Sequence, residues 1–423
     1  APSPRQAFYI GLLIGLAIYA PQLTFFWTLF GPPAVTLWFI LAFWLGLFLS
    51  LAHLAHTRLR GIGAVVLLPF LWTGLEYFRS ECYFFRFSWL SVGYAFSESL
   101  FLQQLGFLGV YGIGFAIVLA LGILSLLPRR IAWGANGILL ALLALLTNLG
   151  PRVSQFPDAT VRSVAVAGMQ LEFPAALEIP FQLDKLAAAH PKAELFVLSE
   201  YTFDGPVPQR VKDWCRKQHR YLVAGGKQPG PGSDFSNTAF VIGPDGEVVF
   251  EQIKSVPIQF FKDGRPAPTR KVWESPWGKI GICVCYDLSY TRVVDDFVRQ
   301  GAQALIVPTM DVREWGQHQH RLHTRVGPVR AAEYAIPIFR LTSSGISQVI
   351  DRRGHTQASA PFGGEGEIIA GELELKNPGR LPFDRVLGPL SVLVTGLFAV
   401  WLLVGQIRAV VAKSNSEVEP AKP

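Results

Sequence analysis

Residues 277–287 read WGKIGICVCYD, and they decide the fold of the larger half of this chain. The run 280–284 is apolar and rich in β-branched residues, with one glycine inside it, which predicts a short buried strand. We expect the strand to end where Cys285 emerges, so that its thiol faces a cleft. The other three cysteines are interpreted as small buried hydrophobes, the commoner role of this residue.

Two further polar groups follow apolar, strand-like runs upstream. Residues 195–198 lead to Glu200, and residues 247–253 lead to Lys254. Acyl transfer from an amide or ester requires a thiolate nucleophile, a carboxylate that takes its proton and a cation that stabilises the oxyanion. Each residue alone would more often be an ordinary strand-end residue. The three in this order predict a catalytic site.

These segments resemble the nitrilase superfamily, whose Glu-Lys-Cys triad lies at strand ends. The resemblance implies that Cys285 is the nucleophile, Glu200 the base and Lys254 the oxyanion stabiliser. It also implies an α-β-β-α sandwich. The residues support an α/β domain independently, because short β-like runs alternate with amphipathic segments from residue 161 onward.

The composition indicates a membrane protein. Of 423 residues, 50% are hydrophobic and only 16% are charged, which is too apolar for an ordinary soluble enzyme. The net charge of +7 does not indicate a nucleic-acid partner, because the basic residues lie at the ends of apolar segments or are scattered singly. The four cysteines lack the spacing of a disulfide framework. No cleavable signal pattern precedes the first apolar segment, so we expect it to be retained as a span.

Six apolar segments approach the roughly 20 residues that a membrane span requires. They are residues 8–30, 34–54, 61–78, 105–127, 131–149 and 386–407. With an even number of spans, the basic residues that flank them all fall on one side, which the positive-inside rule makes cytoplasmic. These residues are Arg5, Arg58, Arg60, Arg129, Arg130, Arg408 and Lys413. The block 150–382 would then face the periplasm from the inner membrane of a Gram-negative bacterium.

The predicted architecture is therefore a multi-pass α-helical membrane domain of about six spans plus an extracytoplasmic α/β nitrilase-like domain. We expect four parts along the chain. They are a five-span transmembrane domain at 1–150, a catalytic domain at 158–378, a C-terminal transmembrane helix at 385–408 and a polar cytoplasmic tail at 409–423.

Other segments resemble the bacterial apolipoprotein N-acyltransferase family more narrowly. Residues 87–94 (FSWLSVGY) and 108–115 (LGVYGIGF) are similar to its Pro-Trp-Leu…Gly-Tyr loop and Gly-Val-Tyr-Gly span start, with Ser88 in place of the proline. Residues 330–334 (RAAEY) match its Arg-Ala-x-Glu helix, which makes Glu333 a supporting residue. The resemblance covers most of 60–410, and the family usually has about two more spans at the N-terminus.

The chain departs from this family near the expected site. The family carries Val-Pro-Phe-Gly-Glu after the lysine, whereas residues 256–261 read VPIQFF and place Phe260 where the second carboxylate is expected. Tyr286 and Asp287 replace a Tyr-Glu pair, and the segment that ends at Trp315 only loosely resembles the Ser-Asn-Asp…Trp-Phe-Gly loop. A carboxylate could orient a cationic amine and Phe260 cannot, so the acceptor stays open. Phe260 could instead contact an acyl chain or simply pack.

No metal or cofactor is expected. His318, His320 and His323 lie close together, but no further ligand pair is spaced to close a zinc site. His323 stands where the family has a structural histidine.

The resemblance implies a membrane-bound acyltransferase. It would move a fatty acyl chain from a phospholipid, through a Cys285 thioester, to an amine such as the N-terminus of a diacylglyceryl-cysteine lipoprotein. One alternative is a membrane-anchored amidase or a lipid N-acyltransferase with another acceptor, which the residue Phe260 motivates. Another is a non-catalytic membrane scaffold.

Overall fold

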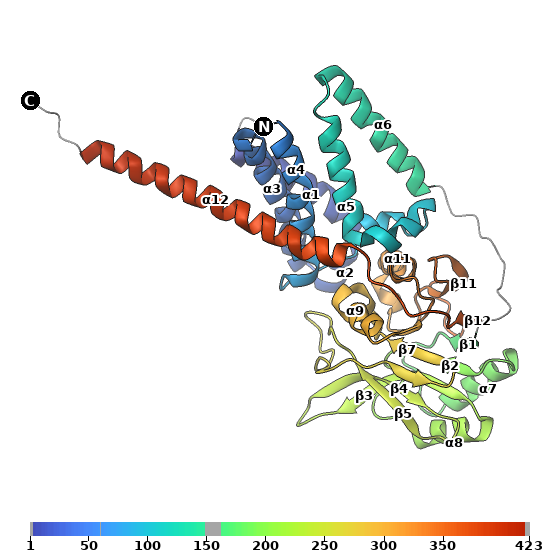
Figure 1. Ribbon diagram of the computed structural model, residues 1–423. Coiled ribbons are helices and arrows are strands. Elements are labelled where there is room, and N and C mark those ends of the chain that lie inside the picture. Colours follow the sequence, from blue (N-terminus) through green and yellow to red (C-terminus); the bar gives the residue numbers. More distant parts are fainter. Residues whose placement is uncertain (1–2, 60, 149–161, 419–423) are drawn as a thin grey trace, which may run out of the picture.

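The computed structural model describes residues 3–59, 61–148 and 162–418 (Figure 1). A bundle of apolar helices stands on a half made of two β-sheets. The bundle contains α1 (Pro4–Gln22), α2 (Phe25–Phe30), α3 (Pro33–Leu59), α4 (Gly61–Tyr77), α5 (Leu105–Leu124), α6 (Arg129–Asn148) and α12 (Asp384–Val418).

Four helical stretches are long and apolar enough to cross a membrane among the described residues. They are Pro33–Leu59, Gly61–Cys82, Phe101–Leu124 and Asp384–Val411. The other two expected spans also form helices, α1 and α6, but these are not among the four. Residue 149, the last of the expected fifth span, lies outside the described residues. The total of six spans stays a prediction.

The expected first span is broken near its end. α1 ends at Gln22, and the short helix α2 begins at Phe25. The carbonyl of Leu23, at the break, accepts hydrogen bonds from the N–H of Phe26 at 3.1 Å and from Trp38 Nε1 on α3 at 3.0 Å. This satisfied polar group makes the break tolerable in an apolar environment. As a result, α2 turns toward the sheet-bearing half.

Small residues let the first helices approach closely. A Cβ added to Gly11 of α1 would lie 2.8 Å from the Cα of Gly46 on α3, and one on Gly15 would lie 2.7 Å from the Cα of Ala42. Close backbone packing of this kind is typical of helices in membranes. In contrast, the C-terminal part of α12 stands away from the other helices (Figure 1). α12 continues through Val418, so no helix end lies at the expected boundary of 408, and residues 419–423 of the expected tail lie outside the described residues.

Two six-stranded sheets form the second half. The first sheet has the order β12-β1-β2-β3-β4-β5, and the second β11-β10-β9-β8-β7-β6. The first sheet is built from β1 (Ser163–Met169), β2 (Leu195–Val197), β3 (Tyr221–Pro229), β4 (Phe235–Ile242), β5 (Val248–Ile253) and β12 (Ile368–Glu374). The second is built from β6 (Trp273–Ser275), β7 (Gly278–Ile282), β8 (Ala304–Thr309), β9 (Ile338–Thr342), β10 (Ser347–Ile350) and β11 (Thr356–Ala360).

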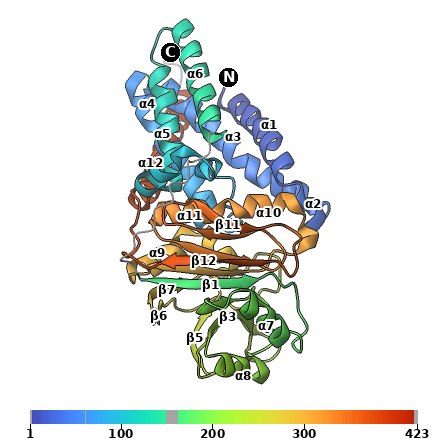
Figure 2. The same ribbon diagram turned by 90° about the vertical axis from the view of Figure 1, so that its right-hand side faces the viewer.

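Helices cover the outer face of each sheet (Figure 2). α7 (Ile179–Ala189) and α8 (Gln209–Gln218) pack on the first sheet. α9 (Thr291–Arg299), α10 (Gln317–Thr324) and α11 (Val326–Tyr334) lie between the second sheet and the membrane helices. The predicted α-β-β-α sandwich is confirmed. It forms because helices such as α9 present one apolar face, with Val293, Val294, Phe297 and Val298 all buried.

Polar groups fasten the two halves together at the N-terminal end of α5. Gly109 has a φ of 76°, so α5 breaks there and two amides point sideways. The N–H of Val110 donates to Glu333 Oε1 at 3.0 Å, and the N–H of Tyr111 donates to Asp384 Oδ2 at 2.9 Å. Arg385 also belongs to this cluster, because its guanidinium lies 3.1 Å from the same Glu333 Oε1. Glu333 therefore lies at the junction between the two halves, and its role as a supporting residue of the site stays a prediction.

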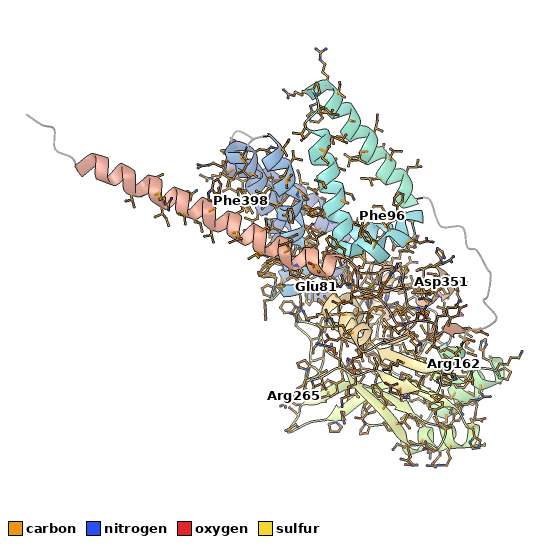
Figure 3. All side chains as sticks on the ribbon, in the orientation of Figure 1. Glu81, Phe96, Arg162, Arg265, Asp351 and Phe398 are labelled. Carbon is orange, nitrogen blue, oxygen red and sulfur yellow. The ribbon has the colours of Figure 1, made fainter. Side chains whose placement is uncertain are left out.

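Glu81 makes a second connection at the same level (Figure 3). Its Oε1 accepts from the hydroxyl of Tyr111 at 2.8 Å and from the N–H of Thr291, the first residue of α9, at 3.2 Å. Membrane helices and sandwich thus share buried hydrogen bonds, and the groups at their boundary are held in fixed positions.

Candidate active site

The strand ends of both sheets converge on one edge of the sandwich. β2 and β3 run parallel in the first sheet, and β7 and β8 run parallel in the second. β5 runs antiparallel to β4 and so returns in the direction of β3. Because side chains at the carboxyl ends of such strands meet, Glu200, Lys254 and Cys285 arrive together.

Cys285 sits in a sharp turn that follows β7. Its φ is +51°, a left-handed conformation that residues with a Cβ rarely adopt. It also begins a short 3₁₀ helix, Cys285–Ser289. Only 2% of the residue is exposed. The turn thus directs one thiol into a confined space at some cost in backbone strain.

Asp287 holds this turn against the segment that carries the lysine. Its carboxylate accepts hydrogen bonds from the N–H of Ser255 at 2.9 Å and of Val256 at 2.7 Å, and from Val284 at 3.3 Å. Burial raises the pKa of Asp287 to about 6, although the hydrogen bonds and Lys254 oppose this shift. The sequence predicted Asp287 as a supporting residue, and the structure places it between the two loops rather than in the cavity.

Glu200 and Lys254 form a buried ion pair. Lys254 Nζ lies 2.8 Å from Glu200 Oε1, and the same oxygen accepts from Asn237 Nδ2 at 2.6 Å. The backbone of Met310, beyond β8, joins this pair to the thiol. Its N–H donates to Glu200 Oε2 at 2.8 Å, and its carbonyl lies 3.7 Å from Cys285 Sγ.

The electrostatics of the site keep the thiol protonated at rest. Burial raises the pKa of Cys285 well above its usual value, Glu200 raises it further, and Lys254 lowers it. Burial also raises the pKa of Glu200, against the opposing effect of Lys254. A thiol in this state needs a neighbouring base before it can act as a nucleophile.

A second carboxylate, Asp263, completes the surroundings of the lysine. Its Oδ2 lies 2.7 Å from Lys254 Nζ and accepts from the N–H of Ile258 at 2.7 Å. Its Oδ1 accepts from the hydroxyl of Tyr201 at 2.7 Å. Burial alone would lower the pKa of Lys254, but Asp263 and Glu200 outweigh it and hold that pKa well above its usual range.

Sequence reasoning missed Asp263. The family motif places the second carboxylate three residues after a proline, at Phe260, whereas the loop here folds back and brings Asp263 to the lysine. One signal was available, because Asp263 is the only acidic residue between Lys254 and Trp273. Phe260 does stand at the motif position, and Asp263 supplies a second carboxylate beside the lysine from another point of the loop.

Cys285 opens into an apolar pocket that both halves of the protein line. The pocket and the open space at its mouth together measure about 840 Å³. Its membrane-side wall comes from α2, α3 and the loop after α4, and includes Phe26, Phe30, Leu37, Leu41, Phe87 and Trp89. Its other wall includes Ile258, Phe260, Phe261, Tyr286, Trp315 and His323.

Three of the expected supporting residues thus lie in this pocket, namely Tyr286, Trp315 and Phe260. Phe260 forms part of its mouth, where 63% of the residue is exposed. Its ring stacks on Phe85 at a centroid distance of 5.8 Å and meets Phe30 of α2 edge-on at 5.6 Å. The mouth therefore consists of aromatic rings from both halves.

The three histidines of α10 point to different partners. His318 Nε2 lies 2.7 Å from the carbonyl of Gln22, and His320 Nε2 lies 3.1 Å from that of Val312. His323 Nδ1 lies 2.8 Å from Asp311 Oδ1. Among the residues that the structure describes, no three His, Cys, Asp or Glu side chains are grouped as metal ligands.

Comparison with known proteins gives two family matches. Residues 1–123 match the model of the apolipoprotein N-acyltransferase N-terminal domain, and residues 165–380 match that of carbon-nitrogen hydrolase. An apolipoprotein N-acyltransferase of Geobacter metallireducens is 27% identical over 88% of this chain and 82% of its own length. That of Shewanella oneidensis is 24% identical over 96% and 88%. Mouse omega-amidase NIT2 is 22% identical over 41% of this chain and 68% of its own length.

Proposed function

We propose that this chain acylates the amino terminus of lipoproteins with a fatty acid taken from a phospholipid. The premise is that the chain belongs to the carbon-nitrogen hydrolase family and is a membrane-bound N-acyltransferase. One observation carries the proposal. The thiol of Cys285, beside a carboxylate and an ammonium group, opens into an apolar pocket built partly from membrane helices.

The first half-reaction loads the enzyme. Glu200 takes the thiol proton, and the thiolate of Cys285 attacks the ester carbonyl of the phospholipid. Lys254 stabilises the oxyanion that develops. The C–O bond then breaks, Glu200 returns the proton to the departing alkoxide, and a lysophospholipid leaves an acyl thioester on Cys285.

The second half-reaction transfers the acyl group. The amine of the acceptor attacks the thioester carbonyl, the C–S bond breaks, and an amide forms. The proton lost by the nitrogen ends on the sulfur of Cys285, so the thiol is regenerated. Lys254 stabilises this second oxyanion as well.

The pocket position fits a lipid donor. Removing an acyl chain from a bilayer costs ~0.8 kcal/mol per CH₂ group, so a phospholipid cannot travel cheaply to a distant site. Here the apolar wall of α2 and α3 continues from the membrane helices to the thiol. The chain can therefore pass from lipid to enzyme along apolar surface.

We place the enzyme in the bacterial inner membrane, with the sandwich on the periplasmic side. The C-terminal end of α3, whose last turn contains Arg58, and the N-terminal end of α6, which begins with Arg129 and Arg130, both lie at the end of the bundle away from the sheets (Figure 1). Basic residues favour the cytoplasmic side, which supports this orientation.

Intact-mass spectrometry tests the proposal. Full-length protein in detergent is mixed with phospholipid, and one acyl group should appear on the wild-type chain. Cys285→Ala should show no adduct and lose at least about a thousandfold in transfer rate. Cys283→Ala is the matched control, because Cys283 is buried two residues away and does not line the pocket.

Adding a diacylated lipopeptide should discharge the thioester and yield a triacylated product. If Cys285→Ala transfers acyl groups at the wild-type rate, the mechanism is wrong. If the loaded wild-type enzyme releases free fatty acid and ignores the lipopeptide, the acceptor is water and the amidase alternative is correct.

A further inference from the structure

His323 lines the pocket that contains Cys285, and its Nε2 is a buried nitrogen without a partner among the described residues. The side chain is 2% exposed. Buried polar atoms in native proteins nearly always have a partner, so an orphan atom on a residue that lines a substrate pocket points to a ligand. The proposed mechanism above does not use this group.

The surroundings of His323 determine what its Nε2 can do. Nδ1 lies 2.8 Å from Asp311 Oδ1, and an imidazole nitrogen at that distance from a carboxylate carries the proton and donates it. Arg340 lies 3.0 Å from the same nitrogen, but its NH2 group donates to Asp311 Oδ2 at 2.6 Å. We assign the ring proton to Nδ1 because of its contact with the carboxylate, which leaves the lone pair on Nε2 and makes Nε2 a hydrogen-bond acceptor.

The imidazole is also neutral. Burial lowers the pKa of His323, and Arg340 and His320 lower it further, against the opposing effect of Asp311. The charge of Asp311 is in turn balanced by Arg340. The site thus offers a neutral acceptor rather than a negative charge.

The ring is held rigidly by the membrane half. Trp89 stacks on His323 with the ring centroids 4.6 Å apart and the planes 15° apart. Trp89 is itself fixed, because its Nε1 donates to Ser289 Oγ at 2.9 Å. The direction of Nε2 is therefore set by contacts on both the ring face and the ring edge.

On the basis of the proposed function, we propose that His323 Nε2 binds the acceptor, by accepting a hydrogen bond from the primary amine that attacks the Cys285 thioester. The chemistry of the two substrates selects this partner. A phospholipid ester brings no N–H or O–H group to its scissile carbonyl, whereas an attacking amine must bring N–H groups there. An acceptor-only nitrogen has no use in the first half-reaction and a clear use in the second.

A neutral acceptor also suits the reaction better than a carboxylate would. An amine attacks only when it is unprotonated, and a free carboxylate would stabilise its ammonium form. The carboxylates around the thiol and its lysine are already engaged, because Glu200 and Asp263 pair with Lys254 and Asp311 pairs with Arg340. His323 is left to orient the neutral amine toward the carbonyl.

Two substitutions remove Nε2 while each keeps a different contact. His323→Asn retains an N–H that can donate to Asp311, and His323→Phe retains the stack on Trp89. In both variants, the rate of thioester formation from phospholipid should stay within about threefold of the wild-type rate, because the first step does not use this group. Intact-mass spectrometry measures this rate. Discharge of the thioester by a diacylated lipopeptide should slow roughly tenfold in both, the worth of one hydrogen bond.

Controls separate this inference from general damage. Hydroxylamine at high concentration should cleave the thioester of both variants at the wild-type rate, because a small, strong nucleophile needs no positioning. His355→Phe, at a buried histidine paired with Asp351 away from the pocket, should change neither step.

The outcomes are distinct. If wild-type enzyme forms no thioester, the proposed function fails. If thioesters form and both variants discharge to lipopeptide at the wild-type rate, Nε2 binds only solvent and this inference is wrong. It is equally wrong if the two variants slow loading and discharge to the same extent.

Discussion

The N–H of Val110 in a membrane helix donates a 3.0 Å hydrogen bond to Glu333 of the sandwich, 223 residues further along the chain. The bond exists because Gly109, with its left-handed φ of 76°, interrupts α5 and frees the amide. The next amide bonds to Asp384, at the start of α12. One glycine therefore determines how three distant segments meet.

Gly109→Ala should destabilise the protein by roughly 3 kcal/mol or more, because it disturbs a buried ionic cluster and strains the backbone. An added Cβ would lie 2.0–2.2 Å from the carboxylate of Asp384. Thermal unfolding in detergent is the measurement. Gly134→Ala in α6 is the control, since its Cβ would meet nothing within 4 Å, and it should leave the midpoint unchanged. Equal midpoints for the two variants would contradict this account of the junction.

Asp263→Asn should slow thioester formation by about a hundredfold, because Lys254 loses one of its two counter-charges. Removal of that charge lowers the pKa of Lys254, so the alkaline limb of the pH–rate profile should move to lower pH. The profile is measured by stopping the reaction at successive times at each pH and determining the acylated fraction of the protein by intact-mass spectrometry. Asp234→Asn, which removes an exposed partner of Arg265, should leave rate and profile unaltered. An unshifted alkaline limb in Asp263→Asn would show that this carboxylate does not control the lysine.

Phe260→Glu should weaken lipid uptake and give no gain in lipoprotein acylation. Asp263 already occupies the place beside Lys254, and a carboxylate at 260 would replace ring contacts with Phe85 and Phe30. At about 0.5–1.5 kcal/mol for each aromatic pair, KM for phospholipid should rise roughly tenfold with little change in kcat. Phe181→Glu, an equally exposed phenylalanine on α7, serves as the control. Faster lipopeptide acylation by Phe260→Glu would refute this prediction.

Asp287 should make stability depend on pH in a defined interval. Burial raises its pKa from 3.8 to about 6, so between these values the folded protein binds more protons than the unfolded chain. By linkage, this group's contribution to stability is greatest at the acid end and falls by ~3 kcal/mol as pH rises through that interval. Asp287→Asn removes the dependence. The difference between the unfolding free energies of wild type and variant should therefore shrink from pH 4 to pH 7, and a pH-independent difference would contradict the assignment.

The sequence was most informative where an apolar run gives way to a polar side chain. Glu200, Lys254 and Cys285 could be singled out because such transitions mark strand ends, and strand ends of one direction gather at one edge. An Asp-Gly pair between two β-rich runs, here Asp245 and Gly246, is likewise typical of a hairpin, and β4 and β5 form one. β12 was not, since its partner β1 lies some two hundred residues earlier and nothing local in the sequence encodes that pairing.

The remaining misses share a physical cause, which is that loops and junctions depend on tertiary contacts. The motif position predicted a missing carboxylate at Phe260, but the path of the loop brings Asp263 to Lys254 instead. The helix motif gave no indication that Glu333 accepts a hydrogen bond from the amide that the break at Gly109 frees, because that contact depends on how α5 packs on α11. The orphan nitrogen of His323 becomes visible only when Asp311 and Trp89 fix the ring.

The pocket draws one wall from residues 25–41 and 85–89 of the membrane half and the other from residues 258–261, 285–286 and 315–323 of the sandwich half, and this separation has an evolutionary consequence. Substitutions at Leu37 or Leu41 in α3 would alter the length or shape of fatty acid that fits, while the segments that bear Cys285 and Lys254 stay untouched. Specificity for the acyl chain and the catalytic chemistry are thus encoded by different residues. As the lipid composition of a membrane changes during evolution, substitutions in the pocket can change the acyl-chain specificity while the catalytic residues stay the same.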